Sequence, residues 1–266
     1  MELTVNGHRA YAYTGGKPLN PALPAIVFIH GALHDHSVWG LAARWFAHHD
    51  HAALALDLPG HGRSAGNPLP DVESNAAWVL ALLQAAGIQK AAFVGHSMGS
   101  LIALEAAAQA PDRASALVMV GTAYPMKVSD ALLSTSRDAP LKAIDMVNAF
   151  SLSTLAAKPS YPGPGMWLHG ANRALMRRTL AGWKGGNLFH HDFSVCNSYA
   201  NGLQAAAKVS CPATLLLGQR DQMTPPKVTR EIQAALRADV ATVPAGHALM
   251  QEDPDGVLAA LRTALD

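Results

Sequence analysis

The sequence predicts an α/β fold built on a mostly parallel sheet of eight strands, with helices on both faces. Two patterns predict it: short apolar runs recur along the chain, and helical patterns lie between most of them. The composition agrees, because half of the 266 residues are hydrophobic and only 15% are charged, which excludes intrinsic disorder. With 20 basic and 19 acidic residues, the chain gives no reason to expect nucleic acid or an anionic membrane surface as a partner.

The strands are predicted in order from these apolar segments. Residues 3–5 and 9–13 flank the pair Asn6-Gly7, which is typical of a tight turn between antiparallel strands. The next six segments are almost continuously apolar, as strands buried on both faces must be: residues 25–29, 52–56, 91–94, 116–120, 213–217 and 240–243. The expected helices span residues 38–47, 72–86, 98–109, 226–236 and 254–265.

Residues 124–208 interrupt the alternation of strands and helices. They contain helix-like segments and a Pro/Gly-rich loop at 158–165, without a good strand candidate. We expect this stretch to form a helical cap over the carboxyl ends of the strands, where ligands bind in open α/β sheets. The predicted organisation is therefore a core of residues 1–123 and 209–266, with a cap of residues 124–208 inserted in it.

The segment Gly95-His96-Ser97-Met98-Gly99 carries the strongest chemical signal. It directly follows the apolar run 91–94 and opens the helical pattern 98–109. In a G-x-S-x-G turn between a strand and a helix, the serine takes a strained backbone conformation and only glycine leaves room on either side. The pattern predicts that the Ser97 hydroxyl stands above the sheet edge as a nucleophile.

A serine nucleophile needs a base, and the base needs an acid to orient it. His247 follows the last predicted strand and Asp221 follows the one before it, so both fall at the same sheet edge as Ser97. The chain order Ser97, Asp221, His247 is the order that a serine nucleophile at a strand-to-helix elbow uses. We therefore expect His247 as the general base and Asp221 as its partner.

The reaction also needs donors for the oxyanion. The backbone amide of Met98, at the start of the elbow helix, is expected to supply one. The other is expected from the loop after the strand 25–29, which reads His30-Gly31-Ala32-Leu33. We place this donor at the Ala32 amide, with Leu33 as the alternative.

Together these segments resemble the α/β-hydrolase superfamily over nearly the whole chain. The resemblance rests on HGA at 30–32 with Trp39 downstream, DLPGHGRS at 57–64, GHSMG at 95–99, GQRD at 218–221 and GH at 246–247. It implies a capped serine esterase or lactonase, and the serine separates the chain from haloalkane dehalogenases and epoxide hydrolases, which use aspartate. The segment 57–64 is interpreted as structural, with Asp57 and Arg63 in an ion pair or a turn network.

The resemblance and the residues next to the predicted site together suggest a substrate pocket. Side chains close in sequence to the nucleophile, the acid, the base or the oxyanion loop are the best candidates for its walls, with one from the cap: Leu33, Trp39, Met223, Leu249 and Met126. An apolar pocket under a small cap favours a small to medium, largely apolar acyl compound over a polymer.

We predict a carboxylic ester hydrolase that works through an acyl-enzyme and takes a small-molecule ester or lactone. A lactonase and a C–C bond hydrolase that acts on diketones remain open, because the same triad serves both. A peracid-forming side activity is also compatible. From another class, a small-molecule receptor of the same fold with negligible turnover remains open.

No cofactor and no metal are expected. Histidine-rich stretches such as 48–51 and 190–192 lack metal-site spacing, and the two cysteines, Cys196 and Cys211, make no disulfide framework. The first residues lack the basic start and apolar core of a signal peptide, and no apolar run is long enough to span a bilayer, so a cytoplasmic location is the expectation. The sequence leaves the oligomeric state open.

Overall fold

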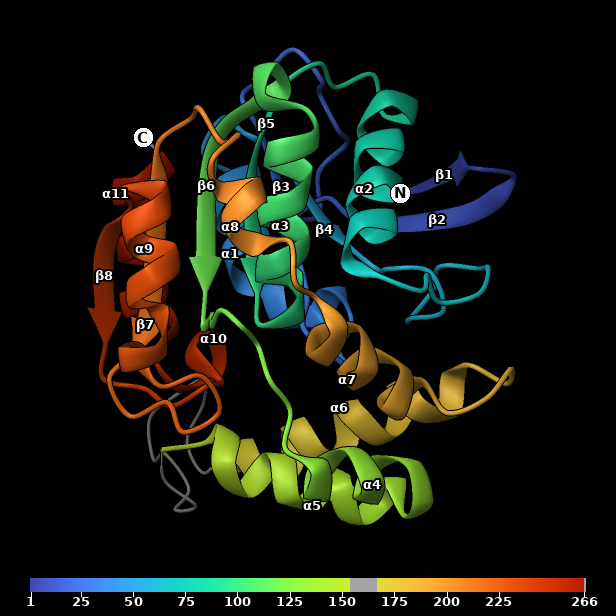
Figure 1. The fold of residues 1–266 in the computed structure, drawn as a ribbon. Helices are drawn as coiled ribbons and strands as arrows, with labels where there is room; N and C mark the ends of the chain where they lie inside the picture. The colour runs from blue at the N-terminus through green and yellow to red at the C-terminus, as the bar shows by residue number, and fades with distance from the viewer. Residues whose placement is uncertain (154–166, 266) are drawn as a thin grey trace.

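A computed structural model describes residues 1–153 and 167–265 of the chain; the predicted loop at 158–165 lies outside this described part. An eight-stranded sheet forms its centre, in the order β1-β2-β4-β3-β5-β6-β7-β8 (Figure 1). The first hairpin is antiparallel and β2 also runs antiparallel to β4, whereas all later neighbours are parallel. The strands are β1 Glu2–Val5, β2 His8–Tyr13, β3 Ala25–Ile29, β4 Ala52–Leu56, β5 Ala91–His96, β6 Ala114–Val120, β7 Ala213–Gly218 and β8 Asp239–Val243.

The predicted fold class is confirmed, and so are the eight strands, with ends that differ by at most two residues. Every residue of β3, β4 and β5 is buried, which explains why these strands appear in the sequence as unbroken apolar runs. The edge strand β8, by contrast, has three of its five residues exposed.

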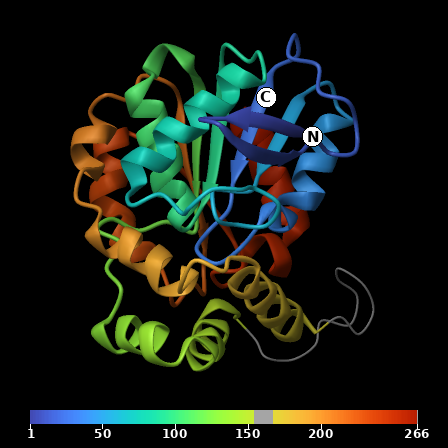
Figure 2. The same cartoon turned by 90° about the vertical axis from the view of Figure 1, so that its right-hand side faces the viewer.

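Helices cover both faces of the sheet. On one face α2 (Val72–Ala85) and α3 (Met98–Gln109) pack together, and on the other α1 (Gly40–Ala47) and α11 (Pro254–Leu265) do so (Figure 2). Two predicted helices begin with a 3-10 turn: η1 (His36–Trp39) precedes α1, and η3 (Pro226–Thr229) precedes α9 (Arg230–Leu236). The sequence did not predict α10 (Leu249–Glu252).

Four helices between β6 and β7 lie below the carboxyl ends of the strands (Figures 1 and 2). We call them the inserted helices: α4 Asp130–Asp138, α5 Pro140–Ser151, α6 Leu168–Gly182 and α7 Leu188–Ser198. The Ser129 side chain caps α4 and the Asn187 side chain caps α7, each by accepting a backbone N–H of the first turn. The short α8 (Gly202–Ala206) packs instead against α3 and α9. The division into core and cap domains stays a prediction.

The length and polarity of a helix decide whether it can cross a membrane. In the described residues, no helix combines the length with the apolar content that crossing a bilayer requires.

Candidate active site

Ser97 stands at a sharp turn between β5 and α3. Its backbone has φ +52° and ψ −120°, which a non-glycine residue rarely adopts, and its amide donates to the carbonyl of Val120 on β6 over 2.9 Å. The turn depends on two glycines. A Cβ at Gly95 would lie 1.9 Å from the Gly99 carbonyl oxygen, and one at Gly99 would lie 2.4 Å from the Ile29 carbonyl oxygen. The strained turn that the sequence predicted is therefore present.

A methyl group at Gly99 is expected to be severely destabilising. Gly99→Ala would push a Cβ into backbone atoms of β3, which cannot move without breaking the sheet, so the free energy of unfolding should fall by roughly 3–5 kcal/mol. Gly40→Ala is the matched control, because a Cβ there meets nothing within 4 Å; its effect should stay within about 1 kcal/mol. Denaturant titration measures both, and equal midpoints for the two variants would contradict the account of the turn.

His247 and Asp221 are paired. Asp221 follows β7, His247 follows β8, and His247 Nδ1 lies 2.8 Å from Asp221 Oδ2. The Thr224 hydroxyl donates to that same carboxylate oxygen over 2.7 Å, and the amides of Met223 and Thr224 donate to Asp221 Oδ1. This geometry assigns the imidazole proton to Nδ1 and leaves the basic lone pair on Nε2.

The surroundings keep Asp221 ionised and His247 fixed. Burial alone would raise the pKa of Asp221, but the charge and hydrogen bond of His247, with the hydrogen bonds from Thr224, hold that pKa well below its usual range. His96 Nε2 donates to the His247 carbonyl over 2.8 Å, and the two rings lie 4.8 Å apart. An imidazole held in this way can accept a proton from a hydroxyl that reaches its Nε2.

Ser97 and His247 line the same hollow, which has a volume of about 290 Å³. Most of its walls come from the inserted helices and the segments that flank them, with the rest from the loop after β7: Met126, Lys127, Val128, Ser129, Leu132, Phe150, Phe193, Cys196, Gln222, Met223 and Thr224. In the described chain the Ser97 hydroxyl makes no hydrogen bond to His247. Hydrogen bonds between a nucleophile and its base are often long or absent before a substrate is bound. A rotation of the Ser97 side chain is enough to change the distance between its hydroxyl and His247.

Two backbone amides next to Ser97 are without an acceptor. In the described residues, neither Met98 N–H nor Ala32 N–H donates a hydrogen bond within the protein. The Leu33 amide, the alternative donor, is already engaged: it donates to Asp192 of α7 over 2.8 Å. Of the two candidates in this loop, only Ala32 is therefore free to bind a substrate oxygen.

The predicted pocket walls are only partly brought together. Met126 and Met223 line the hollow of Ser97. Leu33, Trp39 and Leu249 are fully buried in the hydrophobic core and do not line it. Closeness in sequence to a site residue does not determine where a side chain points, and these three turn inward because the core takes up large apolar groups.

Several residues of the hollow were not among the predicted pocket walls. Phe193, Cys196 and Phe150 line the hollow but stand far from any motif. Burial raises the pKa of the Cys196 thiol far above its usual range, so it stays protonated and does not compete with Ser97 as a nucleophile. Thr224 could have been found, because a threonine three residues after an aspartate is typical of a local turn between their side chains.

Asp57 and Arg63 form a turn network rather than an ion pair. The Arg63 backbone amide, not its guanidinium, donates to Asp57 Oδ2, and the guanidinium donates to the Tyr11 hydroxyl. Asp57 also accepts from His36, and with Asp35 these residues offer metal-ligand atoms within 4.8 Å of one another. The carboxylates, however, are already used by protein donors, including the guanidinium of Arg178 at Asp35.

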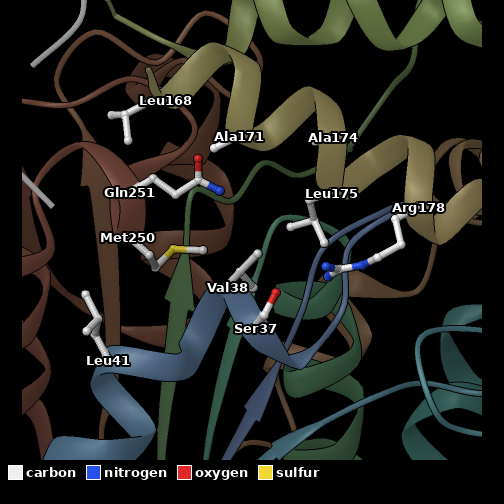
Figure 3. Close-up of a pocket in the computed structure, with 10 residues that line it drawn as sticks. All are labelled: Ser37, Val38, Leu41, Leu168, Ala171, Ala174, Leu175, Arg178, Met250 and Gln251. Atoms are coloured by element: carbon white, nitrogen blue, oxygen red, sulfur yellow. The ribbon is translucent and has the colours of Figure 1, made fainter. Parts of the chain in front are cut away.

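A larger hollow of about 470 Å³ lies between α6 and the start of α1 (Figure 3). Figure 3 shows Leu168 and Leu175 of α6 on one side and Val38 and Met250 on the other, with Arg178 at one end. Ser97 is not among its lining residues, so the chemistry is assigned to the smaller hollow.

A parallel sheet with a strained serine after a central strand, and an aspartate–histidine pair after two later strands, defines a class of α/β proteins that includes many hydrolases. The chain belongs to the alpha/beta hydrolase family, whose sequence profile matches residues 26–260.

Known proteins of similar sequence and structure carry several activities. "Putative carbamate hydrolase RutD" of Klebsiella pneumoniae (strain 342) is 28% identical over 246 residues, covering 88% of each chain. The enol-lactonase of Burkholderia xenovorans LB400 superposes with a TM-score of 0.80 at 22% identity, over 100% of this chain and 99% of that one. A thermophilic esterase superposes with a TM-score of 0.79 at 22% identity, over 99% and 95%. At these identities the two structures support the fold alone.

Proposed function

We propose that this chain is a serine hydrolase that cleaves a carboxylic ester of a small to medium, largely apolar substrate. The observation that carries the proposal is the pairing of His247 Nδ1 with Asp221, in the same hollow as a serine on a strained elbow. A carboxylate in this position fixes the tautomer in which Nε2 acts as base, and it stabilises the imidazolium that forms.

The proposed reaction has two halves. The Ser97 hydroxyl attacks the carbonyl carbon while His247 Nε2 takes its proton, and the oxyanion is bound by the amides of Ala32 and Met98. His247 then gives the proton to the departing alcohol, which leaves the acyl group on Ser97. A water molecule attacks the acyl-enzyme in the same way, and the acid is released. No cofactor enters these steps.

The hollow supports a small apolar acyl group. Its walls include Met126, Phe150, Phe193 and Leu132, and 290 Å³ lies at the lower end of the range for small-molecule sites. Initial rates on p-nitrophenyl esters of increasing acyl length test the proposal. The expected result is multiple turnover with a maximum at a short to medium chain.

Lactones, β-diketones and carbamates complete the substrate panel. A lactone is a cyclic ester that the same residues can open, so higher kcat/KM on lactones would redirect the substrate assignment without changing the roles of Ser97 and His247. Absence of turnover on every ester and lactone would contradict the proposal. Tight binding of a ligand without turnover would then favour a receptor.

Leu132→Trp is expected to shorten the preferred acyl chain. Leu132 lines the hollow from α4 and is only partly buried, so a larger side chain can extend into the hollow. KM for the longest ester that the wild type hydrolyses well should rise about tenfold or more, whereas KM for the acetate ester should stay within about threefold of the wild-type value. Leu133→Trp, on the same helix but outside the hollow, is the control. An unchanged chain-length profile in Leu132→Trp would contradict the assignment of the acyl site.

A further inference from the structure

A buried carboxylate of the inserted helices reaches the loop that carries the free Ala32 amide. Asp192 lies in the middle of α7 and is 2% exposed. It accepts a hydrogen bond of 2.8 Å from the amide of Leu33, which stands at φ +55°. The same carboxylate oxygen, Oδ2, lies 2.9 Å from His61 Nε2. Asp192 therefore connects α7 with two loops at the carboxyl edge of the sheet.

His61 makes this connection an ion pair. Its Nδ1 faces the Pro59 carbonyl at 3.1 Å and its Nε2 faces Asp192, so both ring nitrogens meet acceptors and both must donate. Burial alone would lower the pKa of His61, but the charge and hydrogen bond of Asp192 raise it above its usual value. Both side chains are almost fully buried, and removal of one partner would leave a buried charge uncompensated.

Each peptide group around the Ala32 amide is held in place. The Gly31 carbonyl is bonded by His30 Nδ1 over 2.8 Å, and the Ala32 carbonyl by His34 Nδ1 over 2.9 Å. These two anchors belong to the loop itself. The third, on the Leu33 amide, comes from α7, 159 residues further along the chain. Other segments also support the loop, since His30 Nε2 accepts from the Leu58 amide and His34 Nε2 bonds Asn172 of α6. Because a leucine at positive φ is strained, the contact with Asp192 is the one that acts directly on the strained residue.

We propose that Asp192 is a positioning residue for the oxyanion site: it holds Leu33 in its left-handed conformation and so aims the free Ala32 amide at the reacting carbonyl. The oxyanion donor of the core thereby depends on a helix inserted between β6 and β7. The same helix carries Phe193 and Cys196, which line the hollow of Ser97, so one element shapes the substrate site and aims the donor. The inference rests on the proposed ester hydrolysis.

Three variants test this role. Asp192→Ala removes the acceptor of the Leu33 amide, and kcat should fall about 100-fold, near the effect of losing one oxyanion donor, while KM stays within about threefold. Asp192→Asn keeps an oxygen that can accept from Leu33, so it should recover about tenfold of that loss. Tyr199→Phe is the matched control: its hydroxyl donates to Glu105 of α3 over 2.8 Å, a buried bond between the end of α7 and the core that does not touch the loop 31–33. Its kcat should stay within about threefold of wild type.

Two results would overturn the proposal. One is a folded Asp192→Ala protein whose kcat equals that of Tyr199→Phe, and the other is an asparagine variant no more active than a folded alanine variant. Amide hydrogen exchange at Leu33, measured without substrate, adds a readout independent of turnover: exchange should be at least about tenfold faster in Asp192→Ala than in Tyr199→Phe, and Asp192→Asn should lie between the two. If only the asparagine variant folds, its exchange rate and its kcat, each compared with those of Tyr199→Phe, test the proposal. A wild-type protein that is inactive on all esters would instead overturn the proposed function, whereas a kcat equal to that of wild type in every Asp192 variant would overturn only this inference.

Discussion

Replacement of Ser97 by alanine is expected to lower kcat for ester hydrolysis by roughly 10⁶-fold, to the level that binding and the oxyanion donors alone provide. The loss is this large because the first step is the attack of the Ser97 hydroxyl itself. Cys196 lines the same hollow, but its thiol stays protonated. The elbow itself is built by Gly95 and Gly99, so the variant should fold.

Initial rates with a short p-nitrophenyl ester measure this effect. Ser64→Ala is the control, because Ser64 is also buried but donates to the Asp57 carbonyl, outside the hollow of Ser97. Its kcat should stay within about threefold of wild type. Retention of more than a few per cent of the activity in a freshly purified Ser97→Ala protein would show that another residue performs the attack.

The second large effect is expected at Asp221. Asp221→Asn should lower kcat about 10⁴-fold while the fold is kept, because the asparagine can still accept the amides of Met223 and Thr224. Its amide nitrogen would then face His247 Nδ1 and donate to it. That donation moves the imidazole proton to Nε2, the atom whose lone pair must accept the proton of Ser97.

The histidine tautomer can be measured directly. Nitrogen NMR of His247 should show the proton on Nδ1 in wild type and on Nε2 in Asp221→Asn. Asp71→Asn is the control, since Asp71 caps α2 and asparagine is an equally good cap. If kcat in Asp221→Asn stays within tenfold of wild type, the aspartate does not orient the base.

The fold could be predicted from the sequence because its strands are buried on both faces. Unbroken apolar segments such as residues 25–29 and 91–94 occur for that reason, and the helical patterns between them imply parallel crossovers. The two 3-10 turns before α1 and α9 and the short α10 could not be predicted, because one turn of helix leaves no periodic pattern.

The candidate nucleophile, acid and base could also be proposed from the sequence, since each follows a strand at the same edge of the sheet. The pocket walls could be predicted only in part. Leu33 was expected to face substrate, yet its left-handed backbone turns the side chain into the core. The partner of its amide, Asp192, carries no local signal, because a contact over 159 residues depends on how α7 packs and not on spacing.

The most direct test of the central claim is the site of acylation. The protein would be mixed with excess p-nitrophenyl acetate, quenched in acid within the first turnover and digested, and the peptides would be weighed by mass spectrometry. One acetyl group is expected, on Ser97 of wild type, and none in the active-site peptide of Ser97→Ala. Multiple turnover with an acetyl group on another residue, or with no covalent intermediate under conditions where deacylation is slow, would contradict the central claim.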